Sequence, residues 1–262
     1  MTDVLDVDSL PAVDRRALER LILTLADSKR LMGIRYSDWL LGAPSIETGI
    51  ATSSMAQDEW GHARLVYAML KDLDIDPVAV EHDRSPEEYA SIGALDQEMP
   101  DWAALVAAMV LVDGALTTAL ASFAEGTFES ARGRVPKMLA EEEFHASLGT
   151  AWYRRLARSE GDARRLLIEA TEAMLPDVLA WLGADDGPAR AVANAGVIGP
   201  ADELLAAFRD RVRDVVALAD IDVDRATATT GWDEARGRTP GHPDEHAVER
   251  VRGDKNRALF VE

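Results

Sequence analysis

Residues 57–67 of the chain, QDEWGHARLVY, place Glu59 and His62 three positions apart in a stretch with helical periodicity. Residues at this spacing share one face of a helix, so a carboxylate and an imidazole there can converge on one ion. A single Glu-x-x-His pair is also common by chance in acidic helices. Its meaning depends on whether other helices supply matching partners at the same level.

A second Glu-x-x-His pair, Glu142 and His145, lies in the segment EEEFHASLGTAWYRRL, and the helix predicted before it carries Asp113. All of these residues fall on stripes that repeat at alternating spacings of three and four, the pattern of a helix face turned to the core. Each stripe is apolar except near its middle. Burying a lone charge is unfavourable by several kcal/mol, so these groups need partners or a metal.

Helical periodicity dominates the chain, and no alternating strand pattern stands out. Two antiparallel helix pairs joined by one long crossover are typical of a ferritin-like four-helix bundle, so we predict an all-α fold of this kind. We expect one domain over residues 1–262, with a core bundle over about 14–158 and a C-terminal helical extension over about 159–262. The predicted helices cover residues 14–41, 45–72, 102–128, 132–158, 162–182, 201–218 and 243–259, and the crossover covers residues 73–101.

The heights of the polar residues in the bundle can be worked out by counting. Lys29 and Glu59 lie equally far in sequence from Pro44, where the first hairpin is expected to turn, so they should face each other. Asp113 and Glu142 straddle the expected turn of the second hairpin in the same way. The polar residues can therefore form one layer.

The amino-acid composition limits the possible metal ligands and partners. The chain has no cysteine and five histidines, so any metal must be held by carboxylates and imidazoles. The net charge of −19 argues against partners such as nucleic acid or an anionic membrane surface. We see no apolar run near the ~20 residues of a membrane span and no secretory signal, so we expect a cytoplasmic protein.

Two Glu-x-x-His pairs and an aspartate on the intervening helix match the ligand pattern of di-iron carboxylate bundles. Bridging carboxylates with one imidazole for each ion suit iron that meets dioxygen. The alternatives are that His62 and His145 are ordinary core histidines and that Asp113 pairs with an arginine. Glu141 and Glu143 are expected on solvated flanks.

The chain resembles the phenylacetic acid catabolic family, the ferritin-like subunits of phenylacetyl-CoA epoxidase. The passages that carry the resemblance are APSIETGIATSSMAQDEWGHARLVY, LVDGAL and EEEFHASLGTAWYRRL. The second and third look like parts of the catalytic subunit. The overall length and the C-terminal GRTPGHPDEHAVERV look more like its shorter, non-catalytic partner.

For an active member, the resemblance implies a di-iron oxidoreductase of phenylacetate catabolism. Its iron ligands would be Glu59, His62, Asp113, Glu142 and His145, with no catalytic residue implied beyond them. Such a monooxygenase activates O2 and inserts one oxygen atom into the ring of an aromatic CoA thioester such as phenylacetyl-CoA. Its partners would be a reductase and a homologous ferritin-like subunit, in a homo- or hetero-oligomer.

Lys29 departs from the catalytic pattern, because it stands where the first helix of a catalytic subunit presents a glutamate. An ammonium group cannot bind a metal unless it loses its proton, and it can take part of a cation's place. The leading hypothesis is a di-iron subunit of a multicomponent monooxygenase. The alternative is a metal-free structural subunit of such a complex, with a salt-bridge cluster around Lys29. Two metals, one or none remain open, and iron storage is a third, weaker alternative.

Overall fold

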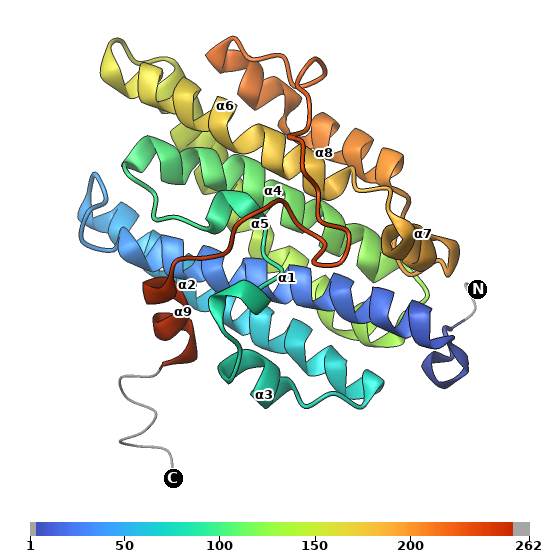
Figure 1. The fold of residues 1–262 in the computed structure, drawn as a ribbon. Helices are drawn as coiled ribbons and strands as arrows, with labels where there is room; N and C mark the ends of the chain where they lie inside the picture. The colour runs from blue at the N-terminus through green and yellow to red at the C-terminus, as the bar shows by residue number, and fades with distance from the viewer. Residues whose placement is uncertain (1–3, 254–262) are drawn as a thin grey trace.

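The computed structural model describes residues 4–253 of the chain, and this part consists of helices and loops (Figure 1). Within the described range there is no strand, and one isolated bridge joins Asp233 and Arg238. The predicted all-α class is therefore confirmed.

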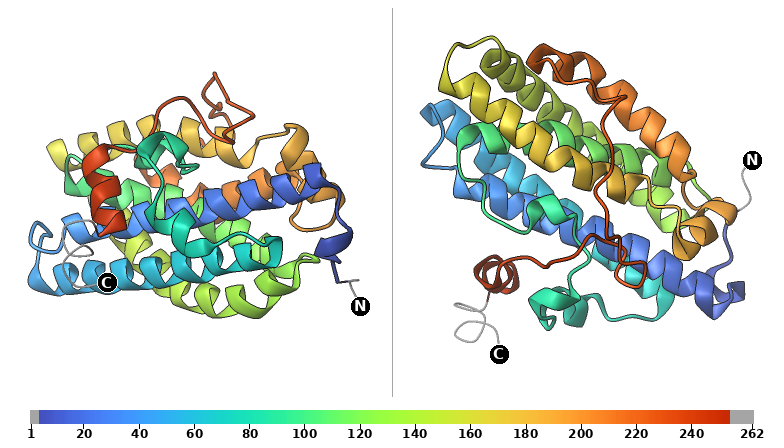
Figure 2. Two further views of the ribbon diagram at one scale, coloured as in Figure 1. Left: turned by 60° about the horizontal axis from the view of Figure 1, so that its bottom comes forward. Right: turned by 45° about the horizontal axis from the view of Figure 1, so that its top comes forward.

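Two long antiparallel hairpins form the core of the molecule (Figures 1 and 2). The first pairs α1 (Ala12–Asp38) with α2 (Ile46–Tyr67), and the second pairs α4 (Trp102–Glu125) with α5 (Glu129–Ala157). A long crossover that contains the short helix α3 (Pro77–His82) connects them. This is the predicted ferritin-like arrangement.

Capping residues explain where the bundle helices begin. The side chain of Ser45 accepts a hydrogen bond from the Thr48 amide before α2, and Asp101 accepts one from Ala104 before α4. The α-helix α2 ends at Tyr67, earlier than predicted, because the chain continues as a 3-10 turn to Leu73.

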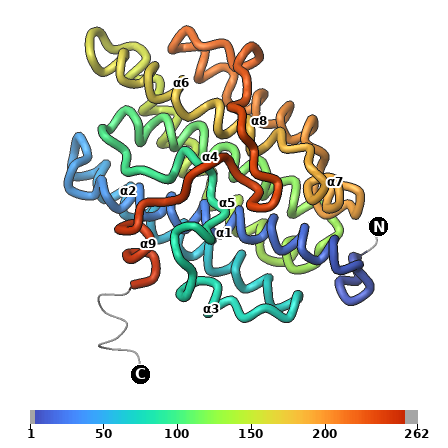
Figure 3. The backbone as a smooth tube through the Cα atoms, in the orientation of Figure 1, coloured from blue at the N-terminus to red at the C-terminus, as the bar shows by residue number. Residues whose placement is uncertain are grey.

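The C-terminal region adds a further layer of helices, α6 (Asp162–Leu182) and α8 (Ala201–Val216), which pack against α4 (Figure 3). The short helix α7 (Gly187–Asn194) was not predicted; Asp186 caps it. The last helix, α9 (Glu245–Arg252), lies within the predicted 243–259, and the end of that prediction falls outside the described residues.

Helix α4 is the centre of the core, and it corrects one expectation from the sequence. It is long and apolar enough to cross a membrane by length and composition, so the expectation that no run approaches this length was wrong. In the structure 94% of its most apolar window is buried, because α5, α6 and α8 pack around it. Asp113 is the one charged residue in the interior of this helix.

The segment between α8 and α9 runs across the outside of α6 and α1 (Figures 1 and 2) and is tied down by buried arginines. Arg238 donates to Asp96 at 2.5 Å and to Ser91 at 3.2 Å. From α1, Arg35 donates to Asp244 at 2.9 Å and to the carbonyl of Leu95. The C-terminal segment and the crossover are thus fastened to the same helix.

Close packing of α2 on the turn that follows α1 gives a test of the first hairpin. At Gly49 an added Cβ would overlap the carbonyl oxygen of Leu40, whereas at Gly61 it would meet no described atom within 4 Å. We expect Gly49→Ala to lower the free energy of unfolding by about 1–3 kcal/mol through overpacking. Gly61→Ala, on the exposed face of the same helix, should raise it by about 0.5–1 kcal/mol. Urea titration of both variants measures this, and equal effects would contradict the described packing.

Candidate functional site

The candidate site is a polar layer in the middle of the bundle, to which all four long helices contribute. Lys29 comes from α1, Glu59 from α2, Asp113 from α4 and Glu142 from α5. All four side chains are buried, with exposed fractions of 2% or less. The layer expected from counting positions along the two hairpins is present.

Lys29 lies at the centre of this layer. Its Nζ donates to Glu59 Oε1 at 2.9 Å, to Asp113 Oδ1 at 2.7 Å and to Glu142 Oε1 at 2.5 Å. An ammonium group has three protons, and each has a carboxylate acceptor here. One cation therefore joins three helices to the fourth.

The predicted metal ligands also converge. Glu59, Asp113, Glu142 and His145 each offer one ligand atom, and these atoms lie within 4.8 Å of one another. The fifth predicted residue, His62, places Nδ1 3.0 Å from Glu142 Oε1. All five predicted residues therefore line one site, and the structure adds that Lys29 contacts three of them.

The two histidines connect the buried layer with carboxylates nearer the surface. His62 Nε2 lies 2.8 Å from Glu141 Oε2, and His145 Nε2 lies 3.4 Å from Asp58 Oδ2. Glu141 was expected on a solvated flank, but its side chain is only 36% exposed, because it turns towards His62. The sequence analysis missed Asp58, although its position next to Glu59 was a signal.

Two hydroxyl groups donate to two of the three carboxylate oxygens that Lys29 does not contact. Tyr36 donates to Asp113 Oδ2 at 2.8 Å, and Thr117 donates to Glu142 Oε2 at 3.0 Å. Both residues lie on the interior stripes, where the sequence indicated only core positions. Among the carboxylates of the layer, Glu59 keeps one buried oxygen, Oε2, without a hydrogen-bond partner in the described structure.

The charges of the layer are set by burial and by the close pairs. Burial alone would lower the pKa of Lys29, but Asp113, Glu142 and Glu59 outweigh it and raise that pKa well above its ordinary value. Burial would likewise lower the pKa of His145, yet its contacts with Asp113 and Glu59 raise it to about 11. For Glu59 burial dominates the attraction of Lys29 and raises the pKa to about 7.

The pKa of Asp113 is shifted in the opposite direction to that of Glu59. Burial favours its neutral form, but Lys29 and His145 outweigh burial and hold its pKa well below the ordinary value. At neutral pH the layer therefore contains the cations Lys29 and His145 opposite buried carboxylates. The two cations offset most of the negative charge of the three carboxylates without a further ion.

A metal ion would have to share the oxygens that Lys29 now occupies. Carboxylates and imidazole are suitable donors for iron, and their number and proximity fit. The ammonium group does not fit, because it is a cation held against three of the oxygens and its raised pKa keeps it protonated. The carboxylates and the imidazole could thus bind a metal ion only if the positive charge of Lys29 were absent from the layer.

The space beside the layer is small. A cavity of about 30 Å3 lies between α4, α5 and α8 and reaches Asp113 and Glu142, with Arg211 and Val212 on its outer side. Because one water needs roughly 10–15 Å3 measured in this way, the cavity has room for about two waters. It has no room for an aromatic ring.

A buried carboxylate and histidine layer inside two antiparallel hairpins with one long crossover defines a protein of the ferritin-like carboxylate class. The family described as "Phenylacetic acid catabolic protein" matches residues 1–252. The chain belongs to this family, which confirms the resemblance inferred from its motifs. No curated protein matches the chain.

Lys29→Met is expected to destabilise the fold strongly, because it leaves the carboxylates of the layer without their central cation. Removing one partner from a buried charge cluster typically costs about 3–5 kcal/mol. The matched control is Lys137→Met, since Lys137 is 78% exposed and lies 3.7 Å from Glu141. That change should alter stability by less than about 1 kcal/mol. Thermal melts in metal-free buffer compare the two variants, and similar melting temperatures would contradict the central role of Lys29.

Proposed function

We propose that this chain is a non-catalytic, structural member of the phenylacetic acid catabolic family. In this role Lys29 replaces metal charge in the middle of the bundle, and the chain supports a homologous, iron-carrying subunit of a multicomponent monooxygenase. The observation that carries the proposal is the triple contact of Lys29 Nζ with Glu59, Asp113 and Glu142 at 2.5–2.9 Å.

Electrostatics supports this assignment over a working di-iron centre. Two divalent ions among these side chains would add four positive charges next to Lys29 and the protonated His145. Like charges within a few ångströms in a low-dielectric interior repel strongly. Lys29 and the protonated His145 already offset two of the three carboxylate charges, so little negative charge is left to favour an added ion.

The small space for a substrate beside the polar layer supports the same assignment. An oxygenase that acts on an aromatic thioester must place the ring next to the reactive centre, at roughly 3–3.5 Å between reacting atoms. The cavity of about 30 Å3 beside Asp113 and Glu142 does not admit a ring. A structural role needs no such space.

The second candidate function is the di-iron oxygenase itself. It is favoured by the four ligand atoms within 4.8 Å of one another and by His62 beside them. Bound iron would supply the redox chemistry that activates dioxygen. The residues of this chain would then hold the metal through Glu59, His62, Asp113, Glu142 and His145, provided that Lys29 moved away.

Exchanging the lysine for the carboxylate of the catalytic pattern separates the two functions. We expect wild-type protein, produced with added ferrous iron, to retain less than about 0.1 iron per chain. Lys29→Glu should bind iron towards two per chain, because it removes the repelling cation and supplies a further ligand. Without iron this variant should melt earlier than wild type, since its buried carboxylates repel one another, and ferrous iron should restore its melting temperature.

Iron content by elemental analysis and thermal melts with and without ferrous iron measure these effects. Lys29→Met is the matched control, because it removes the cation without adding a ligand and should bind less iron than Lys29→Glu. Stoichiometric iron in the wild type would overturn the structural assignment in favour of the oxygenase. Unchanged iron content in Lys29→Glu would contradict the idea that the layer is a metal site altered by one residue.

A further inference from the structure

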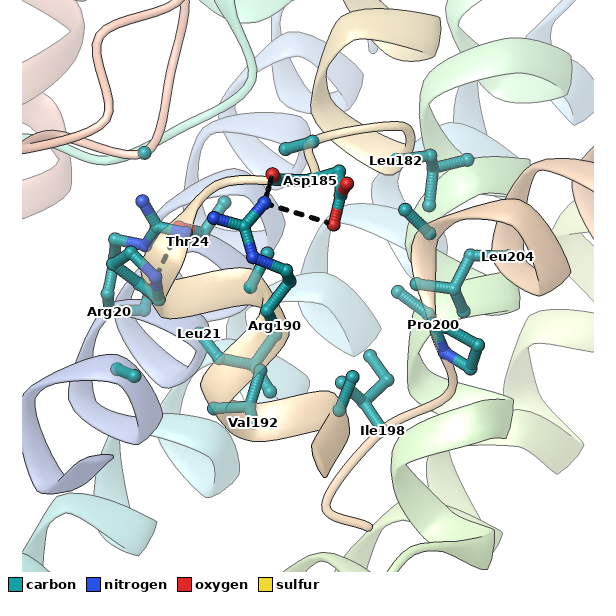
Figure 4. A pocket seen from close by; sticks show the side chains of 18 of the residues that line it. Arg20, Leu21, Thr24, Leu182, Asp185, Arg190, Val192, Ile198, Pro200 and Leu204 are labelled. Atoms are coloured by element: carbon teal, nitrogen blue, oxygen red, sulfur yellow. Dashed lines mark hydrogen bonds and ion pairs between the residues drawn. The ribbon is translucent and has the colours of Figure 1, made fainter. Parts of the chain in front are cut away.

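A second cavity, separate from the polar layer, lies where α7 and the end of α6 meet α1 (Figure 4). Its volume is about 160 Å3. Residues 198–200 and the first turn of α8 line one part of the cavity, and Trp232 from the C-terminal segment lines another. The proposed structural role does not use this cavity, so a ligand could bind there whether or not that role is correct.

The walls of the cavity are mainly apolar. The apolar side chains that line it include Leu21, Trp181, Val192, Ile198 and Leu204. The buried polar groups around it already have partners within the protein. An apolar cavity with saturated walls gains little from holding water and favours an apolar guest.

Arg20 and Trp232 show this saturation. Arg20 donates to both carboxylate oxygens of Asp186, at 2.7 and 2.6 Å, and to the carbonyl of Glu234. Trp232 Nε1 donates to Asp186 at 2.8 Å, and Thr24 donates to the carbonyl of Arg20. None of these donors is available to a ligand unless the Asp186 cluster opens.

Arg190 is different, because it is held only loosely at the mouth of the cavity. Its side chain reaches over the apolar residues towards Asp185 (Figure 4), with Nη1 3.5 Å from Asp185 Oδ1 and bonded to the Asp185 carbonyl. The two side chains are 56% and 72% exposed. An exposed pair of this kind contributes little to stability, so a carboxylate of a ligand can replace Asp185 at low cost.

The volume sets the size of the guest. A dry apolar cavity of about 150 Å3 accepts one benzene molecule, and this cavity measures about 160 Å3. It therefore holds one six-membered ring, and a short acidic arm would extend to the rim.

We propose that this cavity is a binding site for a small aromatic monocarboxylate. The ring occupies the apolar chamber between α1, α7 and the start of α8, and the carboxylate accepts hydrogen bonds from Arg190. The site lies on the opposite side of the α1 and α4 layer from the α2 and α5 face, so binding there does not require access to Lys29.

Calorimetric titration of the full chain with phenylacetate tests the proposal, with its neutral isostere phenylacetamide as the paired probe. We expect saturable binding of phenylacetate at one site per chain, and weaker binding of the amide. Because Trp181 and Trp232 line the cavity, binding should also change the tryptophan fluorescence. Absence of saturable phenylacetate binding, or equal affinity for acid and amide, would overturn the proposal.

Two variants locate the site. Arg190→Gln should weaken phenylacetate binding about three- to fivefold, the range of an exposed ion pair, and leave phenylacetamide unchanged. Arg165→Gln is the matched control, since Arg165 forms an exposed pair with Glu169 on α6 away from the cavity and should change neither affinity. Ala193→Leu, which fills the chamber, should abolish binding of both probes. Unchanged phenylacetate binding in Ala193→Leu protein with a normal melting temperature would place the ligand elsewhere and overturn the proposal.

Discussion

The contact of one buried ammonium group with three carboxylates is the interaction on which the rest of the bundle depends. Lys29 is completely buried, so its charge is tolerable only if acceptors surround it. Those acceptors come from α2, α4 and α5. A shift of either hairpin by one helical turn, about 5.4 Å, would separate the ammonium from its partners and leave buried charges unpaired. The cluster therefore fixes the register of all four helices, which apolar packing alone would specify less strictly.

Around this centre the polar contacts extend outward in an ordered way. Tyr36 and Thr117 orient the carboxylates within the core, and His62 and His145 connect them with Glu141 and Asp58 at the edge. Two buried atoms of the network, Glu59 Oε2 and His62 Nδ1, have no hydrogen-bond partner in the described structure. Burial raises the pKa of Glu59 to about 7, because burial and the neighbouring charges of Asp113 and Glu142 together outweigh the attraction of Lys29.

Much of this arrangement could be predicted from the sequence, for identifiable reasons. The long helices are indicated by apolar periodicity, and the level of Lys29 and Glu59 is indicated by their equal distance to the turn at Pro44. Other features could not be predicted, since they depend on tertiary contacts between distant segments. Helix α7 is too short for a clear period, and the inward turn of Glu141 depends on His62 from another hairpin.

A Glu-x-x-His pattern is therefore not sufficient to identify a metal site. Once a lysine occupies the centre of the layer, every surrounding carboxylate is needed to compensate it, whether or not an ion ever binds. Replacing Asp113 alone by an apolar residue would remove the acceptor of Lys29, Tyr36 and His145 together, and such losses in a buried network are costly. The ligand residues of a metal site thus become the structural residues of a salt-bridge cluster without any change of their own. In this chain the residue that distinguishes the two states is Lys29, which lies outside both Glu-x-x-His motifs.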